Sequence, residues 1–220
     1  MDKFSLIITA GGTSSRYGSK NKLLEEIGNQ TVIEHTLSNF LDFENITEIV
    51  IPVNESIKEE FKALLKDNRI KFVNGGETRQ KSVFNALQTV TNDYVMIHDG
   101  ARPLITKHVI SEVMDMTVKY SAVSVMTKTT DTIKEVNSEG IIVRTVDRSP
   151  LYNTQTPQAF KTELIRNAHL KFFDKNYTDD SSIIEDTGFP VHIIIGSYKN
   201  IKITTKSDLD FAKLYIDTDN

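Results

Sequence analysis

A glycine-rich segment with basic residues follows the first apolar run of the sequence. Ala10–Gly18 carries Arg16, and Lys22 comes shortly after it. Ligands of open parallel sheets bind at the carboxyl ends of strands, where glycine lets backbone N–H groups approach phosphate oxygens. The segment therefore predicts a phosphate-binding loop charged by Arg16 and Lys22. A glycine-rich turn with solvated basic residues would have the same composition.

A second glycine pair, Gly75-Gly76, follows the third apolar run and precedes Arg79 and Ser82. Because the carboxyl ends of parallel strands meet at one edge of a sheet, this pair should converge on the first loop. A guanidinium and a hydroxyl on the opening turn of a helix can bind a base, a ribose or a phosphate. The alternative is a tight turn followed by a helix cap.

A carboxylate and a guanidinium, Asp99 and Arg102, follow the fourth apolar run. A carboxylate at this edge can bind Mg²⁺ or accept a hydrogen bond from a substrate hydroxyl. The same two side chains could instead form an ion pair that fixes a loop. We interpret His98, at the end of the run, as a packed residue and not as a catalyst.

Composition and missing motifs exclude several classes of protein. Neither G-x-G-x-x-G nor G-x-x-x-x-G-K-[ST] occurs, which argues against a nicotinamide oxidoreductase and a P-loop NTPase. The formal charge of -4, from 26 basic and 30 acidic residues, argues against nucleic-acid binding. The chain has no cysteine and therefore no disulfide, and no apolar run approaches the roughly 20 residues that span a bilayer. We expect a soluble, cytoplasmic protein with no nucleic-acid or membrane partner.

Short runs rich in β-branched residues alternate with amphipathic helical patterns in the first part of the chain. The apolar runs are Phe4–Thr9, Glu48–Val53, Ile70–Asn74, Tyr94–His98 and Ala122–Met126. The helical patterns cover Thr31–Phe40, Ile57–Leu65, Val83–Val90 and Lys107–Val118. Uninterrupted apolar runs suit strands that are buried on both faces of a parallel sheet, and the alternation indicates βαβ units. The sequence therefore predicts an α/β fold with a Rossmann-like, mostly parallel sheet flanked by helices.

The alternation stops after residue 127, where two strand-like runs flank a polar turn. Asp131–Val136 and Ile141–Val146 lie on either side of Asn137–Gly140, a pattern typical of a β-hairpin. We expect a single domain over residues 1–220, from which residues 129–148 protrude as a β-arm. An isolated two-stranded ribbon is only marginally stable. The arm should therefore lie on its own domain or against another chain, and the second case would make it a dimerisation arm.

The last part of the chain shows weaker patterns. We expect a helix near Lys161–Phe173, an acidic segment at Thr178–Glu185 and a strand at Val191–Ile195. A closing helix should run from about Ser207 to Tyr215, with Ser207 as its N-cap.

Taken in order, the motifs resemble one enzyme family from Ile7 to Leu209. The matching segments are Ala10-Gly11-Gly12…Arg16…Lys22, Gly75-Gly76-x-x-Arg79-x-x-Ser82-Val83, His98-Asp99-x-Ala101-Arg102-Pro103, Asp131-Thr132-Ile133-Lys134, Val146-Asp147-Arg148-x-x-Leu151, Gln155-Thr156-Pro157-Gln158-x-Phe160, Thr178-Asp179-Asp180 and Asn200-Ile201-Lys202-Ile203-Thr204. They are similar to those of the 2-C-methyl-D-erythritol 4-phosphate cytidylyltransferases of the non-mevalonate isoprenoid pathway. The resemblance implies transfer of CMP from CTP to the polyol phosphate, with release of pyrophosphate. Three positions depart from the family pattern, which has glycine, proline and alanine where this chain has Ser14, Asn21 and Gly100.

The resemblance also implies a role for individual residues. Stabilisation of the transition state and orientation of the attacking phosphate fall to Arg16, Lys22, Arg148 and Lys202. Binding of CTP falls to Ala10, Gly11, Gly12, Ser14, Gly76, Glu77, Ser82 and Gly100. Binding of the polyol phosphate falls to Asp99, Arg102, Thr132, Thr156 and Thr178, some of them from the hairpin of a partner subunit. The cofactor would be Mg²⁺, held mainly by the CTP phosphates, and the attacking phosphate oxygen is already anionic and needs no general base.

Other functions remain open at this point. Ribitol-5-phosphate cytidylyltransferases, which serve cell-wall polymer synthesis, share these motifs and differ in the acceptor pocket. A non-catalytic nucleotide-sensing domain could keep the fold, but it would not need Arg16, Lys22, Arg148 and Lys202 together. Turnover of the two acceptors would separate these alternatives. An NAD-dependent oxidoreductase fails on the missing dinucleotide motif.

Overall fold

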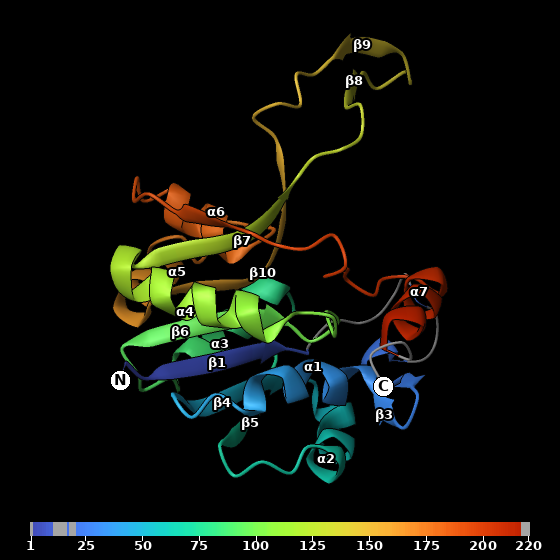
Figure 1. Ribbon diagram of the computed structural model, residues 1–220. Coiled ribbons are helices and arrows are strands. Elements are labelled where there is room, and N and C mark those ends of the chain that lie inside the picture. The colour runs from blue at the N-terminus through green and yellow to red at the C-terminus, as the bar shows by residue number, and fades with distance from the viewer. Residues whose placement is uncertain (1, 11–16, 18–20, 217–220) are drawn as a thin grey trace.

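A mixed, mostly parallel sheet forms the centre of the protein. The computed structural model describes residues 2–10, 17 and 21–216. The sheet has seven strands in the order β11-β7-β10-β6-β1-β4-β5 (Figure 1). Their bounds are β1 Phe4–Thr9, β4 Ile46–Val53, β5 Ile70–Asn74, β6 Tyr94–Asp99, β7 Ala122–Lys128, β10 Tyr152–Lys161 and β11 His192–Ile195. All neighbouring strands pair in parallel except β10, which runs antiparallel to both β6 and β7.

Helices cover both faces of the sheet and create two hydrophobic cores. The helices are α1 Val32–Leu41, α2 Glu55–Leu64, α3 Arg79–Leu87, α4 Lys107–Tyr120, α5 Thr162–Lys171, α6 Asp180–Glu185 and α7 Lys206–Ile216, with a 3₁₀ turn η1 at Lys22–Leu24. Along β1, Leu6 and Ile8 join the core beneath α1 and α4, whereas Ile7 joins the core beneath α3 and α5. Successive side chains of a strand point to opposite faces, so a strand buried on both sides must be apolar throughout. The predicted fold class is confirmed.

Two helix starts differ from the sequence-based expectation. The helix expected from Val83 begins at Arg79, because the Thr78 hydroxyl accepts a hydrogen bond from the Lys81 N–H and caps it. We had expected Ser207 to be the N-cap of the last helix, but it lies inside that helix. The Thr205 hydroxyl accepts the Asp208 N–H, and the Asp208 carboxylate accepts the Thr205 N–H at 2.7 Å. This reciprocal capping places the helix start before Ser207.

Several elements were missed from the sequence. Strand β10 lies between β6 and β7, and the acidic segment contains the short helix α6. A small two-stranded sheet, β2 Glu26–Ile27 and β3 Gln30–Thr31, precedes α1. In the described part of the chain, no helix combines the length and the apolar character needed to cross a membrane.

The predicted hairpin is present and extends away from the main sheet (Figure 1). It pairs β8 Lys134–Val136 with β9 Ile142–Thr145. The Asn137 carboxamide accepts hydrogen bonds from the backbone of Glu139 and Ile141, and Gly140 has a φ of +81° that favours glycine. Four aliphatic side chains of the hairpin are about half exposed, at 49–60%, namely Val136, Ile141, Ile142 and Val143.

Candidate active site

The carboxylate at the end of β6 is the centre of a charged cluster. Asp99 is buried, and three cations surround it. Lys202 Nζ lies 2.8 Å from Oδ2, Arg102 Nε lies 3.6 Å from Oδ2, and Arg79 Nε lies 3.3 Å from Oδ1. We call these four residues the Asp99 cluster. Residues from α3, from the end of β6 and from the segment before α7 thus meet at the carboxyl edge of the sheet, where a parallel α/β fold binds its ligands.

The charges of the cluster determine the protonation of its members. Burial raises the pKa of Asp99, but Arg79, Lys202 and Arg102 outweigh it and hold the pKa well below its usual value. Burial lowers the pKa of Arg102, and Asp99 opposes that change. The cluster therefore contains one carboxylate and three cations at neutral pH. A surplus of positive charge at the edge of the sheet suits an anionic ligand such as a phosphate.

Thr156 and His98 form a hydrogen-bonded chain that holds the backbone of Asp99 in place. The Thr156 hydroxyl accepts the Asp99 N–H at 3.0 Å and lies 3.1 Å from His98 Nδ1. His98 Nε2 lies 3.2 Å from the Arg102 carbonyl oxygen, which can only accept, so Nε2 carries the proton and Nδ1 accepts from Thr156. Burial lowers the pKa of His98 to about 4. His98 is thus a neutral packed residue, as the sequence suggested, and it fixes the turn between Asp99 and Arg102.

The buried imidazole predicts a defined pH dependence of stability. Below pH 6.5 a histidine of the unfolded chain takes up a proton, whereas His98 in the folded protein stays neutral down to about pH 4. The free energy of unfolding should therefore fall by about 3 kcal/mol as the pH drops through this window. Urea denaturation at several pH values should show this slope in the wild type and a much smaller one in His98→Gln. Equal slopes in both proteins would contradict the prediction.

Only part of the predicted phosphate loop can be placed. Gly11, Gly12, Ser14 and Arg16 lie outside the described residues. Ala10 is buried at the end of β1. Lys22 opens the 3₁₀ turn η1, where the Asn21 side chain accepts the Leu23 N–H at 3.0 Å. Asparagine in place of the family's proline therefore caps this turn.

Lys22 interacts electrostatically with Asp208 of α7. Burial raises the pKa of Asp208, but hydrogen bonds from the Thr205 and Thr204 N–H groups and the charge of Lys22 lower it below its usual value. The charge of Lys22 thus acts on the first turn of α7, the helix that follows Lys202 in the chain.

The residues expected to bind the nucleoside are folded into the start of α3. Ser82 is buried, and its hydroxyl accepts the Gly76 N–H at 2.9 Å and donates to the Thr78 carbonyl. A Cβ on Gly76 would come within 2.5 Å of Lys81 Cβ, so only glycine permits this approach. Glu77 is exposed and pairs with Lys81. Ser82 therefore shapes the glycine turn, and its hydroxyl is engaged within the protein.

Gly100 stands where the family pattern has alanine, and the packing explains the difference. Its N–H donates to the Thr9 carbonyl at 3.1 Å, and its own carbonyl accepts from the Thr36 hydroxyl at 2.8 Å. A Cβ would lie 2.9 Å from Ile33 Cδ1 and 3.0 Å from the Thr9 oxygen. The ends of β1 and β6 are therefore pressed against α1 too closely for a methyl group.

The remaining expected acceptor contacts are not gathered at the Asp99 cluster within one chain. Thr132 and Arg148 are exposed on the arm and at its base, where an Arg148 N–H donates to the Thr130 carbonyl. Thr178 is exposed just before α6. Of the predicted catalytic and acceptor residues, the structure brings together Asp99, Arg102, Thr156 and Lys202.

Two members of the site have contacts that the sequence analysis did not predict, since it expected Arg79 to meet a base, a ribose or a phosphate and gave Asn200 no role. Arg79 connects Asp99 to the buried Asp180, with its Nη1 2.8 Å from Asp180 Oδ2. Asn200 binds Arg102 through its carbonyl oxygen at 2.7 Å, and its side chain donates to the Thr156 carbonyl at 3.0 Å. Arg79 was visible as the arginine of the second glycine motif, but nothing in the sequence pairs it with Asp180.

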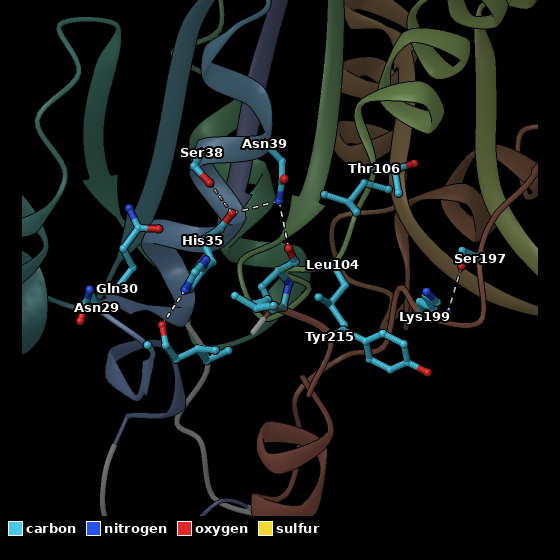
Figure 2. A pocket seen from close by; sticks show the side chains of 15 residues that line it. Asn29, Gln30, His35, Ser38, Asn39, Leu104, Thr106, Ser197, Lys199 and Tyr215 are labelled. Carbon is cyan, nitrogen blue, oxygen red and sulfur yellow. Dashed lines mark hydrogen bonds between the residues drawn. The ribbon is translucent and has the colours of Figure 1, made fainter. Parts of the chain in front are cut away.

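A cleft of about 860 Å³ lies beside this cluster, between α1, β2, the segment after Arg102 and α7. Figure 2 shows His35 turned to the Ile27 carbonyl at 2.8 Å and Asn39 joined to the Pro103 carbonyl at 2.9 Å. None of the predicted site residues line the cleft. We place the candidate site at the Asp99 cluster, because the buried charges and their convergence at the carboxyl edge of the sheet are found there.

Comparisons with known proteins identify the family of this chain. A family model for 2-C-methyl-D-erythritol 4-phosphate cytidylyltransferase matches residues 4–218. An enzyme of that name from Geobacillus kaustophilus is 41% identical over 97% of this chain and 96% of its own length. One from Bacillus thuringiensis is 38% identical over 97% of both chains. The crystal structure of a 4-diphosphocytidyl-2C-methyl-D-erythritol synthase from Anaerococcus prevotii has a TM-score of 0.87 and 31% identity, covering 98% of this chain and 96% of the other. The chain belongs to the 2-C-methyl-D-erythritol 4-phosphate cytidylyltransferase family.

Proposed function

We propose that the protein transfers CMP from CTP to 2-C-methyl-D-erythritol 4-phosphate in isoprenoid precursor synthesis. An oxygen of the acceptor phosphate attacks the α-phosphorus of CTP. The bond from that phosphorus to its bridging oxygen breaks, and pyrophosphate leaves. The observation that carries the proposal is the Asp99 cluster, which gathers three cations around one buried carboxylate in a chain of this family. Phosphoryl and nucleotidyl transfer depends mainly on positioning and on electrostatic stabilisation, and this cluster can supply both.

The exposure of the cluster residues suggests how they divide the work. Lys202 is the most accessible, with 39% of its side chain exposed, and can reach a bound α-phosphate. Arg102 is nearly buried, at 11%, and with Asp99 can form the wall that binds the polyol and its phosphate. Arg148, with Arg16 and Lys22 of the first loop, would complete the positive surroundings of the transferred phosphate. Since the nucleophile is an anion, no residue is required to remove a proton.

We propose that Mg²⁺ enters this site bound to the triphosphate. Among residues 2–10, 17 and 21–216, no group of three or more His, Asp or Glu side chains could hold a metal ion. The carboxylate of Asp99, which the sequence had suggested as a ligand, faces three cations and does not suit a metal. When bound, the ion would neutralise phosphate charge. The described part of the chain therefore contributes to the site through its cations.

We further propose a homodimer that forms through the arm. Four half-exposed aliphatic side chains on a marginally stable two-stranded ribbon form a surface that a second copy of the chain would cover. Light scattering at micromolar concentration should give the mass of a dimer. The double variant Ile142→Lys, Val143→Lys should give a monomer, whereas Leu170→Lys, at an exposed position on α5, should remain a dimer. A wild-type monomer would contradict this proposal.

The function is tested by the release of pyrophosphate from CTP and Mg²⁺ in the presence of an acceptor. We expect release with 2-C-methyl-D-erythritol 4-phosphate, none with ribitol 5-phosphate, and none when Mg²⁺ is chelated. Release with ribitol 5-phosphate alone would keep the reaction and change the acceptor. Release with neither acceptor would overturn the proposal in favour of a nucleotide-sensing domain.

A further inference from the structure

Arg79 lies between two buried carboxylates at the edge of the candidate site. Its Nε lies 3.3 Å from Asp99 Oδ1, and its Nη1 lies 2.8 Å from Asp180 Oδ2. The Asp180 side chain is 1% exposed, and its other oxygen lies 3.4 Å from the buried His169. Only a planar guanidinium can hold two carboxylates in a fixed relative orientation, because the ammonium of lysine is a single point of charge. The arginine therefore fixes the position of Asp99 relative to α6.

The two oxygens of Asp99 face different partners. Oδ1 is held by Arg79 and by the Thr9 hydroxyl at 3.2 Å, both of which are engaged within the protein. Oδ2 faces Lys202 at 2.8 Å and Arg102 at 3.6 Å. Anchoring of Oδ1 leaves Oδ2 as the oxygen directed toward the residues proposed to meet the phosphates. Arg79 thus sets the rotation of the carboxylate that the acceptor would meet.

The position of Asp180 is fixed in turn by two glutamine side chains. Gln158 of β10 accepts the N–H groups of Asp180 and Ser181 at 2.9 and 3.0 Å. Gln80, next to Arg79 on α3, accepts the Tyr177 N–H at 3.1 Å. Both ends of the segment 177–181 are therefore tied to the body of the protein. Thr178, an expected acceptor contact, lies on this segment.

We propose that Arg79 and Asp180 are positioning residues for the acceptor, a pair that orients Asp99 and ties it to the segment carrying Thr178. The inference rests on the proposed function, in which Asp99 and Thr178 bind the polyol phosphate. Neither Arg79 nor Asp180 needs to touch the substrate. The pair acts on the acceptor half of the site and leaves the binding of CTP unchanged.

The test compares steady-state kinetics of Arg79→Lys and Asp180→Asn with the wild type. Loss of a contact between charged groups at this buried position should raise the KM for 2-C-methyl-D-erythritol 4-phosphate by about 10-fold or more in each variant. The KM for CTP should stay within about 2-fold of the wild type, because the pair acts on the acceptor half of the site. A purely structural defect would instead raise the KM for both substrates. Arg69→Lys is the matched control, since Arg69 also holds a partly buried carboxylate, Asp67. This pair lies just before β5, the edge strand that is separated from β6 by β1 and β4. Arg69→Lys should leave both KM values unchanged.

The outcomes separate the inference from the function. If the wild type turns over the acceptor and the folded variants have an unchanged KM for the acceptor, the inference is overturned and the proposed function stands. An equal rise of both KM values would also overturn it. Wild-type protein that releases no pyrophosphate would overturn the proposed function, and the inference with it. If Asp180→Asn does not fold, Arg79→Lys, which keeps the charge, decides the question alone.

Discussion

Replacement of Lys202 by alanine should lower turnover by about two to three orders of magnitude, as the loss of one transition-state donor does in other enzymes. Lys202 is the most exposed cation of the Asp99 cluster and the one best placed to meet the α-phosphate. Lys22→Ala should give a fall of similar size. Because Lys202 is not part of a hydrophobic core, the variant should fold, and its melting temperature should stay close to that of the wild type.

Lys199→Ala is the matched control for Lys202→Ala. Lys199 is an exposed lysine in the same segment and lies over the ring of Tyr215 at 4.7 Å. Its removal should change turnover by less than about 2-fold, since charges outside the site contribute little to the transition state. Near-normal turnover in both Lys202→Ala and Lys22→Ala would refute the roles assigned to these two residues.

Asp99→Asn should lower the free energy of unfolding by about 3 kcal/mol, besides weakening the binding of the acceptor. The substitution removes the one carboxylate that faces three cations and leaves the nearly buried Arg102 without its counter-charge. Urea denaturation at pH 7 measures the change. In the folded protein the pKa of Asp99 is depressed, so its contribution is fully present above about pH 4. It is lost as the pH falls further, through the pKa of the folded state.

Asp67→Asn provides the comparison for Asp99→Asn. Asp67 pairs with Arg69 at 2.8 Å, but both side chains are about one-fifth exposed. Water can replace much of this interaction, so the loss should be about 1 kcal/mol. If Asp99→Asn cost no more than Asp67→Asn, the three cations of the cluster would not depend on the buried Asp99 carboxylate as we describe.

Among the strands of the main sheet, the sequence predicted those that contain an apolar run and missed β10, whose centre is polar. The runs at Phe4–Thr9 and Ile70–Asn74 match β1 and β5 residue for residue. Strand β10 contains Gln155, Thr156 and Pro157, which lack any apolar period and include a residue disfavoured in strands. Its register with β7 is interrupted between Thr154 and Gln158. Its place between β6 and β7 depends on partners distant in the chain, which local patterns do not reveal.

From the residues alone, the candidate site was predictable where a motif lies at the end of a strand, whereas Thr156 and Lys202 were indicated by the family resemblance. Asp99 and Arg102 share one motif, and the rule that ligands bind at the carboxyl edge indicated their importance. The Arg79–Asp180 pair joins residues far apart in the chain, and pairing of that kind follows from the packing of α5 against both α3 and α6. Ser82 was assigned to the nucleoside by its motif, yet its hydroxyl is engaged by Gly76 and Thr78. A motif indicates candidate residues, but the contacts of each residue depend on the fold.

The arm also affects the risk of aggregation of the newly made chain. Before it forms the proposed dimer, a newly made chain carries Val136, Ile142 and Val143 on a ribbon with open backbone edges, the kind of surface on which misassembly begins. Charged side chains interrupt that surface, since Arg144 pairs with Glu135 across the hairpin. Charged side chains beside apolar strands oppose aggregation, and we expect Glu135 and Arg144 to do so here. Selection at Glu135 and Arg144 would then be for yield of folded protein, independent of the chemistry at the Asp99 cluster.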